Sequence, residues 1–282
     1  MIIKATMAQT KLILKRKEAI CVFYALLIMV LANFIGNVLD FQGSYVSNMC
    51  HPMRLLLLSY DMTDWSADGI LLFIQVYPLL VACAAGFSLA GEYRRGTQVF
   101  LVSRLGNRSY YVSKYLAVFL ATMIIFSAPF LLEILLNCVS FPLSATGNLA
   151  NEAYYSYEYR DAVEHYLMKG LFLYSPYLYA IVGTLFFGAV SGLLGVFTVA
   201  VSSLIRVKYM VFLFLPVFVG LNLLSIVGSR LPRVAPSILW YDYLLLFNDQ
   251  EKSPLILAAG LLVLILFSVA AACISGKRDC LS

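Results

Sequence analysis

Charged and histidine side chains are scarce in this sequence, and their scarcity excludes most classes of enzyme. Only 12% of the 282 residues are charged, whereas about a quarter are charged in an average soluble domain. The two histidines, His51 and His165, lie outside every long apolar run. No H-E-x-x-H zinc motif and no phosphate-binding loop of the form G-x-x-x-x-G-K-[ST] occurs. We therefore expect no catalytic site, no metal site and no cofactor in this chain.

The six cysteines do not suggest a zinc or redox site, because no two of them form a C-x-x-C pair. Four lie within apolar runs, where cysteine packs as a small hydrophobic residue: Cys21, Cys83, Cys138 and Cys273. The net charge of +5 is not gathered into a basic cluster with interleaved aromatic residues. We therefore expect no nucleic-acid partner and interpret the charge as a signal of membrane topology.

Long apolar runs are abundant. Hydrophobic residues make up 62% of the chain, and its mean hydropathy is +0.86. A membrane span needs about 20 predominantly apolar residues, and in lipid such a segment must be helical. Six runs qualify: 19–39, 68–90, 115–141, 177–204, 210–229 and 254–274. The sequence predicts an all-α integral membrane protein with six transmembrane helices in a single transmembrane domain, residues 1–282.

The distribution of Lys and Arg predicts the orientation. With the N-terminus inside, the inner segments carry fourteen of the twenty Lys and Arg residues and the outer segments carry six. Short cytoplasmic segments are enriched in these residues. We therefore expect both termini and the segment 91–114 to be cytoplasmic, and the segments 40–67, 142–176 and 230–253 to lie outside.

Three segments outside the spans have alternative interpretations. Residues 2–17 are either a basic flank or an amphipathic helix on the inner leaflet. The tyrosine-rich segment 142–176 is either an aromatic belt on an interfacial helix or a lip that contacts cargo or a partner. The segment 230–253 is apolar but too short to span, which favours a re-entrant or interfacial helix before the sixth span.

Few polar side chains fall inside the predicted spans. Glu133 is the one deep carboxyl group, and Asn137 shares its helix face. Asn33 and Asn37 form a similar pair in the first span. Ionisable groups in a membrane are costly and face the bundle interior or water. Glu133 is either a hydrogen-bonded structural residue or a transport residue.

Small residues recur on the fourth span. Gly188 and Gly192 form a G-x-x-x-G pair, and Ser191 with Gly195 forms a second ridge of small residues. This spacing lets two helix backbones approach closely in lipid. We expect a tight helix–helix contact there.

The polar segment 91–114 predicts a short helix between two membrane helices. Gly96 can end the second span, Thr97 is the expected N-cap, and Gly106 can end a helix over residues 98–105. Phe100 and Leu101 offer an apolar knob. Basic residues surround it: Arg94, Arg95, Arg104 and Arg108. Such a helix either inserts into a groove of a partner protein or lies on anionic lipid headgroups.

The same segment resembles a known family. Glu92-x-x-x-Gly96-Thr97, followed by Leu101, Ser103, Arg108 and Lys114, is similar to the E-x-x-x-G-T…L…S…R…K pattern of ABC-2 type transporter permeases. The motif covers about twenty residues, and the six-span layout resembles the family more widely. The chain departs from the pattern at Leu105, where members often carry proline, and in the length of segment 142–176.

The resemblance implies the membrane subunit of an ABC exporter in the plasma membrane of a bacterium. It implies a coupling helix, a second permease chain, and an ABC ATPase subunit that binds ATP and Mg²⁺. The residues expected at the contact with that ATPase are Glu92, Arg95, Gly96, Thr97, Phe100, Leu101, Arg104 and Arg108. Of these, Glu92 and Arg95 are expected to fix the segment 91–114. The scarcity of deep charges favours a hydrophobic or amphipathic cargo, such as a peptide, lipid or drug. The alternative is an ion- or proton-coupled secondary transporter that uses Glu133.

Overall fold

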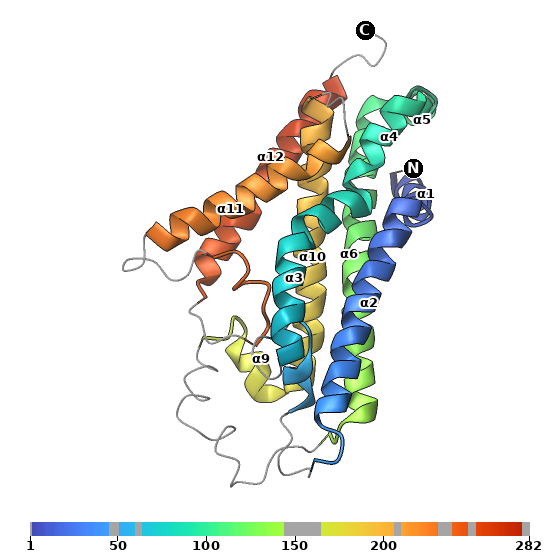
Figure 1. Ribbon diagram of the computed structural model, residues 1–282. Helices are drawn as coiled ribbons and strands as arrows, with labels where there is room; N and C mark the ends of the chain where they lie inside the picture. The colour runs from blue at the N-terminus through green and yellow to red at the C-terminus, as the bar shows by residue number, and fades with distance from the viewer. Residues whose placement is uncertain are drawn as a thin grey trace.

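The structure is a computed structural model that describes residues 2–44, 51–59, 64–143, 165–205, 210–230, 239–247 and 252–277. Within these ranges all regular secondary structure is helical (Figure 1). Extended backbone is paired there only in an isolated bridge between Ser59 and Phe247. The predicted all-α class is therefore confirmed.

Five helical stretches of the described chain are long and apolar enough to cross a membrane. They are α2 (Lys17–Asp40), the bent helical stretch Asp68–Arg95, α6 (Asn107–Ser140), α10 (Pro176–Leu204) and α12 (Pro254–Lys277). A shorter helix, α1 (Ile2–Leu14), precedes α2. The chain is thus a multi-pass membrane protein by the length and composition of its helices.

The predicted fifth span, 210–229, is not one long helix. It consists of a short turn, η4 (Met210–Phe214), and α11 (Leu215–Arg230). Pro216 stands at the second position of α11, and proline is favoured in the first turn of a helix because its missing backbone N–H has no helical partner there. The 16 residues of α11 extend about 24 Å at 1.5 Å per residue, short of a hydrocarbon core of about 30 Å.

The second apolar run is bent. It comprises α3 (Asp64–Val81), a π-helical turn η3 (Ala82–Gly86) and α4 (Phe87–Arg95), and α3 contains Pro78. Proline and π-turns are common causes of helix bends. Figure 1 shows the chain changing direction between α3 and α4.

The helices α6 and α10 pack with almost no space between them. A Cβ added at Gly188 would lie 1.9 Å from Ser127 Oγ, and one at Gly192 would lie 2.9 Å from the backbone oxygen of Phe119. A Cβ at Gly195 would lie 2.8 Å from Thr122 Oγ1. The expected close contact at the small-residue ridge is confirmed.

Two of the segments expected to lie outside differ from their predictions where the structure describes them. In the segment 230–253, which is described only in part, residues 240–244 form turns and not the expected re-entrant or interfacial helix. The segment 51–59, part of a stretch expected to be polar and loop-like, contains the buried 3₁₀ turn η2 (Pro52–Leu55), and Leu56, Leu57 and Leu58 are at most 2% exposed. The two segments meet, because Leu246 N donates to Leu58 O at 2.8 Å.

Most of the tyrosine-rich segment 142–176 lies outside the described residues. Its described end contains the short helix α9 (Lys169–Tyr174). Tyr166 is buried and stacks on Tyr179 of α10, with ring centroids 5.6 Å apart. This tyrosine therefore belongs to the packed interior and not to an exposed aromatic lip.

Candidate functional site

The short helix predicted between the second and third spans is present as α5 (Thr97–Leu105). It is bounded by Gly96 at φ +67° and Gly106 at φ +77°. These left-handed angles favour glycine and let three helices meet with single-residue joints. The segment 91–114 is therefore helical almost throughout, since α4 runs to Arg95 and α6 begins at Asn107.

Thr97 is not the N-cap that the sequence predicted. Gly96 occupies that position, and no side chain caps the helix. The Thr97 hydroxyl instead donates to the Glu92 carbonyl oxygen at 3.5 Å. The close joint at Gly96 explains the difference, because α5 begins immediately after α4 ends.

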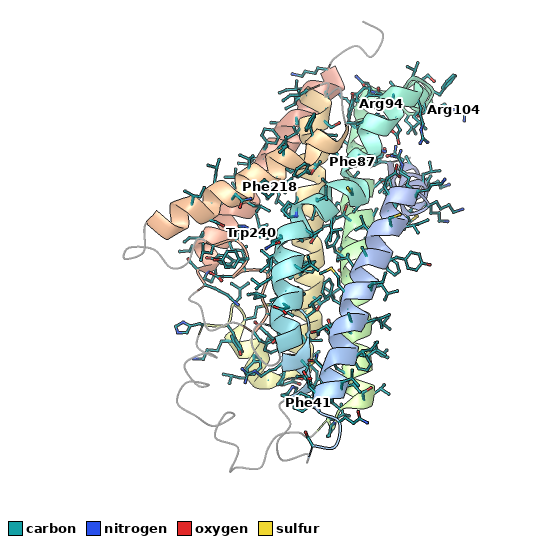
Figure 2. The ribbon with its side chains drawn as sticks, in the orientation of Figure 1. Phe41, Phe87, Arg94, Arg104, Phe218 and Trp240 are labelled. Atoms are coloured by element: carbon teal, nitrogen blue, oxygen red, sulfur yellow. The ribbon has the colours of Figure 1, made fainter. Side chains whose placement is uncertain are left out.

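The predicted contact residues on α5 have different surroundings. Phe100 is 72% exposed, and Arg95 and Arg104 are exposed beside it. Figure 2 shows Arg94 and Arg104 at this end of the molecule, opposite Phe41. Leu101, which was expected to share the knob, instead packs against an apolar cluster formed with α6. Phe100 alone is the exposed aromatic tip.

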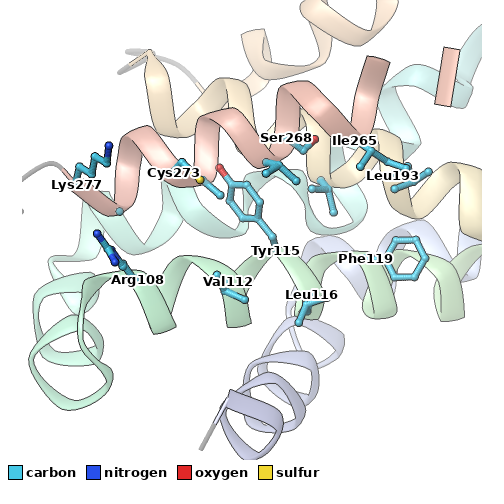
Figure 3. Close-up of a pocket in the computed structure, with 14 residues that line it drawn as sticks. Arg108, Val112, Tyr115, Leu116, Phe119, Leu193, Ile265, Ser268, Cys273 and Lys277 are labelled. Carbon is cyan, nitrogen blue, oxygen red and sulfur yellow. The ribbon is translucent and has the colours of Figure 1, made fainter. Parts of the chain in front are cut away.

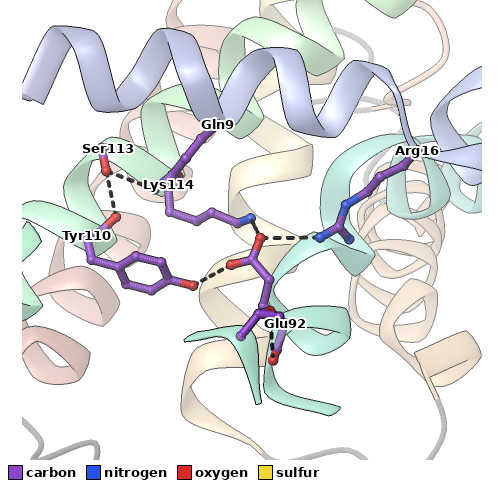
Figure 4. A network of polar contacts seen from close by, with 7 residues as sticks. Gln9, Arg16, Glu92, Tyr110, Ser113 and Lys114 are labelled. Carbon is purple, nitrogen blue, oxygen red and sulfur yellow. Dashed lines mark hydrogen bonds and ion pairs between the residues drawn. The ribbon is translucent and has the colours of Figure 1, made fainter. Parts of the chain in front are cut away.

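Glu92, in the last turn of α4, is buried. Its Oε1 accepts from Lys114 Nζ at 2.5 Å and from Arg16 Nη2 at 3.2 Å. Its Oε2 accepts from the Tyr110 hydroxyl at 2.5 Å. The Lys114 side chain is 1% exposed and that of Arg16 is 26% exposed. We call these four residues the Glu92 network (Figure 4).

The Glu92 network joins three parts of the fold that are far apart in sequence. Glu92 lies in the last turn of α4, Arg16 precedes α2, and Tyr110 and Lys114 lie in the first turns of α6. Ion pairs with this many hydrogen bonds to one carboxylate hold their partners in a single geometry. Among the described residues, both ion pairs found are made by Glu92.

Further hydrogen bonds attach α1 and α5 to the first turns of α6. Gln98 of α5 donates to the Tyr111 hydroxyl at 3.1 Å, and that hydroxyl bonds to the Tyr93 hydroxyl at 2.8 Å. Gln9 of α1 donates to Ser113 Oγ at 3.2 Å. The helix α5 is therefore fixed to α4 and α6, and α1 is fixed to α6.

The exposed surface of α1 carries both apolar and basic residues. Its buried residues are Thr6, Gln9, Thr10 and Ile13, whereas Ile3 and Met7 are 70% and 60% exposed and Lys4 and Lys11 are exposed as well. Residues 2–14 are therefore helical, and the lipid-surface interpretation of residues 2–17 stays a prediction.

Arg108 lies away from the α5 tip. It is exposed at the mouth of a groove between α6 and α12 and shares this mouth with Lys277 (Figure 3). The neighbouring Asn107 donates to the Gly276 carbonyl oxygen at 3.0 Å, so the end of α12 lies beside the start of α6. Arg108 is therefore placed differently from the other predicted contact residues.

The polar residues predicted inside the spans gather at the opposite end of the bundle. Glu133 is 0% exposed, and its Oε1 accepts from Asn33 Nδ2 at 2.7 Å and from Leu57 N at 2.8 Å. Asn33 and Asn37 donate to the Leu55 carbonyl oxygen, and Asn137 donates to that of Pro52. These four side chains, the Glu133 cluster, hydrogen-bond to each other and to backbone groups of the buried segment 51–59.

His51 begins that buried segment. Its Nδ1 accepts from Met53 N at 3.2 Å and so caps the 3₁₀ turn η2. Burial, together with the nearby charge of Arg54, lowers the pKa of His51 from 6.5 to about 4. A neutral imidazole is required for this cap, since the protonated ring has no acceptor nitrogen.

Sequence reasoning missed two features of the site. It did not pair Arg16 or Lys114 with Glu92, because ion pairs between separate helices leave no local pattern. It also missed the burial of residues 51–59, although the run Met53-Arg-Leu-Leu-Leu-Leu58 is apolar except for Arg54.

Among the described residues, no group of three His, Cys, Asp or Glu side chains could hold a metal ion.

Comparisons of the chain with protein-family models, with curated proteins and with solved structures find no match.

Proposed function

We propose that this chain is the membrane-spanning permease subunit of an ATP-binding cassette exporter. The ATP and Mg²⁺ are bound by a separate nucleotide-binding subunit, which contacts α5. A second permease chain, identical or related, completes the pathway. The proposal takes η4 and α11 together as the fifth of six crossings, and it places the protein in the plasma membrane of a bacterium.

The observation that carries this proposal is the way in which buried hydrogen bonds fix α5, with its exposed Phe100, to the membrane helices. A helix with an exposed aromatic tip and a basic rim suits insertion into a groove of a partner. The hydrogen bond from Gln98 to Tyr111 fixes α5 to α6, and the ion pair between Glu92 and Lys114 fixes the adjoining α4 to α6. A helix that only rested on lipid would not need these contacts.

These contacts also suggest how a movement of α5 is transmitted to the membrane helices. Displacement of α5 by a partner reaches α4 through the Gly96 joint. The Glu92 network passes it to the starts of α2 and α6. A partner can shift the membrane helices between two arrangements only if it binds one of them better, so a rigid connection is needed.

The proposed orientation places α5 in the cytoplasm. The helices α1 and α5 lie at one end of the bundle with the last turn of α12 (Figure 1), which supports placing the basic inner segments together. Cytoplasmic segments carry the excess of Lys and Arg. Both termini are therefore proposed to be inside.

Co-purification tests the proposal. Purified from its native membrane, the wild-type chain should bring an ATPase with it, and Phe100→Asp should release that ATPase. Ile3→Asp is the matched control, since it makes the same change at a residue of α1 that is 70% exposed, compared with 72% for Phe100. Retention of the ATPase by Phe100→Asp, or equal loss in both variants, contradicts the proposal.

The cargo is proposed to be hydrophobic or amphipathic, such as a peptide, lipid or drug. The long helices carry few deep charges, and Glu133 is engaged by Asn33 and the Leu57 backbone. Cells that lack the gene should be more sensitive than wild-type cells to some compounds of this class. Equal survival against a broad panel argues against this cargo.

A proton-coupled carrier is the alternative, and one observation favours it. Glu133 Oε2 is buried with no hydrogen-bond partner among the described residues. A carrier should move cargo in vesicles that contain this chain alone under a proton gradient, and Glu133→Gln should stop it. Transport that requires ATP and a second protein excludes this alternative.

A further inference from the structure

A groove runs along one side of the bundle, separate from α5 and from the Glu133 cluster. It has a volume of about 610 Å³ and lies between α6, α10 and α12. Its α6 wall includes Val112, Leu116 and Phe119, which follow Arg108 at helical spacing. Its α12 wall includes Ile265 and Val269, so the floor and sides are largely apolar.

One end of the groove is cationic. Figure 3 shows Arg108 and Lys277 at this end, with Phe119, Leu193 and Ile265 at the other. No residue that lines the groove is acidic. Neither Arg108 nor Lys277 makes an ion pair with any of the described residues.

The groove has the dimensions of a lipid in one leaflet. From Arg108 to Phe119, α6 rises about 16 Å at 1.5 Å per residue, and half of a hydrocarbon core is about 15 Å. The cationic end lies beside the α4–α5 end of the bundle, where the headgroups of one leaflet are expected. A headgroup at Arg108 and Lys277 thus leaves an acyl chain alongside Val112, Leu116 and Phe119.

We propose that this groove binds one phospholipid with an anionic headgroup. The phosphate region contacts Arg108 and Lys277, and one acyl chain lies between α6 and α12. Basic pockets between membrane helices bind anionic headgroups by this combination of charge and apolar surface. The assignment of the site to the inner leaflet rests on the orientation proposed above. The lipid would hold the end of α12 against the start of α6, next to the Glu92 network.

Native mass spectrometry of the full chain released from nanodiscs tests this proposal. The wild type should retain phosphatidylglycerol in preference to phosphatidylcholine. Arg108→Gln and Lys277→Gln should each reduce phosphatidylglycerol retention about fivefold, as expected for one surface charge. Val112→Trp should block both lipids by filling the groove, and it alters a side chain that is already 42% exposed and so leaves the core unchanged.

Lys11→Gln is the charge-matched control, because Lys11 is an exposed cation of α1 outside the groove. It should leave retention unchanged. Equal retention of the two lipids by the wild type overturns the proposal, as does an equal loss in Lys11→Gln. If Val112→Trp instead abolishes association between two copies of the chain, the groove is a protein interface and the proposal is wrong.

The same samples separate this proposal from the proposed function. An ATPase that co-purifies with a wild-type chain showing no lipid preference overturns the lipid site alone. A lipid preference without any co-purifying ATPase overturns the transporter assignment alone.

Discussion

Replacing Glu92 by glutamine should destabilise the protein strongly, although the two side chains have nearly the same shape. The change leaves Lys114, whose side chain is 1% exposed, without its carboxylate partner. Removing one member of a buried ion pair costs about 3–5 kcal/mol, because the other charge remains buried and uncompensated. We expect a loss of this size in the free energy of unfolding.

A double variant distinguishes this cause from a general loss of packing. Glu92→Leu combined with Lys114→Met removes both buried charges and keeps similar volumes. Arg16 can turn toward water, since 26% of its side chain is already exposed. The Tyr110 hydroxyl loses its acceptor, which costs about 1–3 kcal/mol. The double variant should therefore be more stable than Glu92→Gln.

Unfolding of the purified chain in mixed detergent measures both changes. Glu18→Gln is the control, because Glu18 is an exposed carboxylate in the first turn of α2. Its effect should lie within about 0.5 kcal/mol of wild type. The reasoning is refuted if Glu92→Gln lies within about 1 kcal/mol of wild type or if the double variant is less stable than Glu92→Gln.

Two further predictions concern the cap that His51 forms on η2 and the close contact between α6 and α10. His51 must be neutral to accept from Met53 N, and its pKa is lowered from 6.5 to about 4. Stability should therefore be complete above about pH 6.5 and decrease by about 3 kcal/mol as the pH falls toward 4. His51→Asn keeps an acceptor without titrating, so a pH dependence that persists in it refutes this assignment. Gly192→Ala should cost about 1–3 kcal/mol through overpacking, because its Cβ would lie 2.9 Å from Phe119 O. Gly260→Ala, with nothing within 4 Å of its Cβ, should cost nothing; equal unfolding free energies of the two variants would contradict the packing argument.

Local patterns in the sequence predicted most of the helices. Apolar runs of span length predicted α2, α6, α10 and α12, since a lipid-exposed backbone must be helical. Two glycines predicted where α5 begins and ends, because they alone accept the left-handed joints at Gly96 and Gly106. The length of α11 was overestimated, since hydropathy does not register the turn η4 that precedes it.

Contacts between distant segments could not be predicted in the same way. Glu92 was expected to fix the segment 91–114, but its partners Arg16 and Lys114 are 76 and 22 residues away. Apart from the contact between Asn33 and Glu133, the partners of Glu133 and the asparagines are backbone groups of the segment 51–59, which was expected to be a polar loop. A polar side chain in a span indicates that a partner exists, but only the fold identifies that partner.

The proposed contact between α5 and a cytoplasmic ATPase can be probed in intact membranes with a photo-reactive benzophenone amino acid in place of Phe100, because the native side chain is 72% exposed at the tip of α5. We expect one protein adduct, containing an ATP-binding subunit. An adduct with lipid alone, or quenching of the reaction by an impermeant reagent added outside the cell, would show that α5 does not bind a cytoplasmic ATPase.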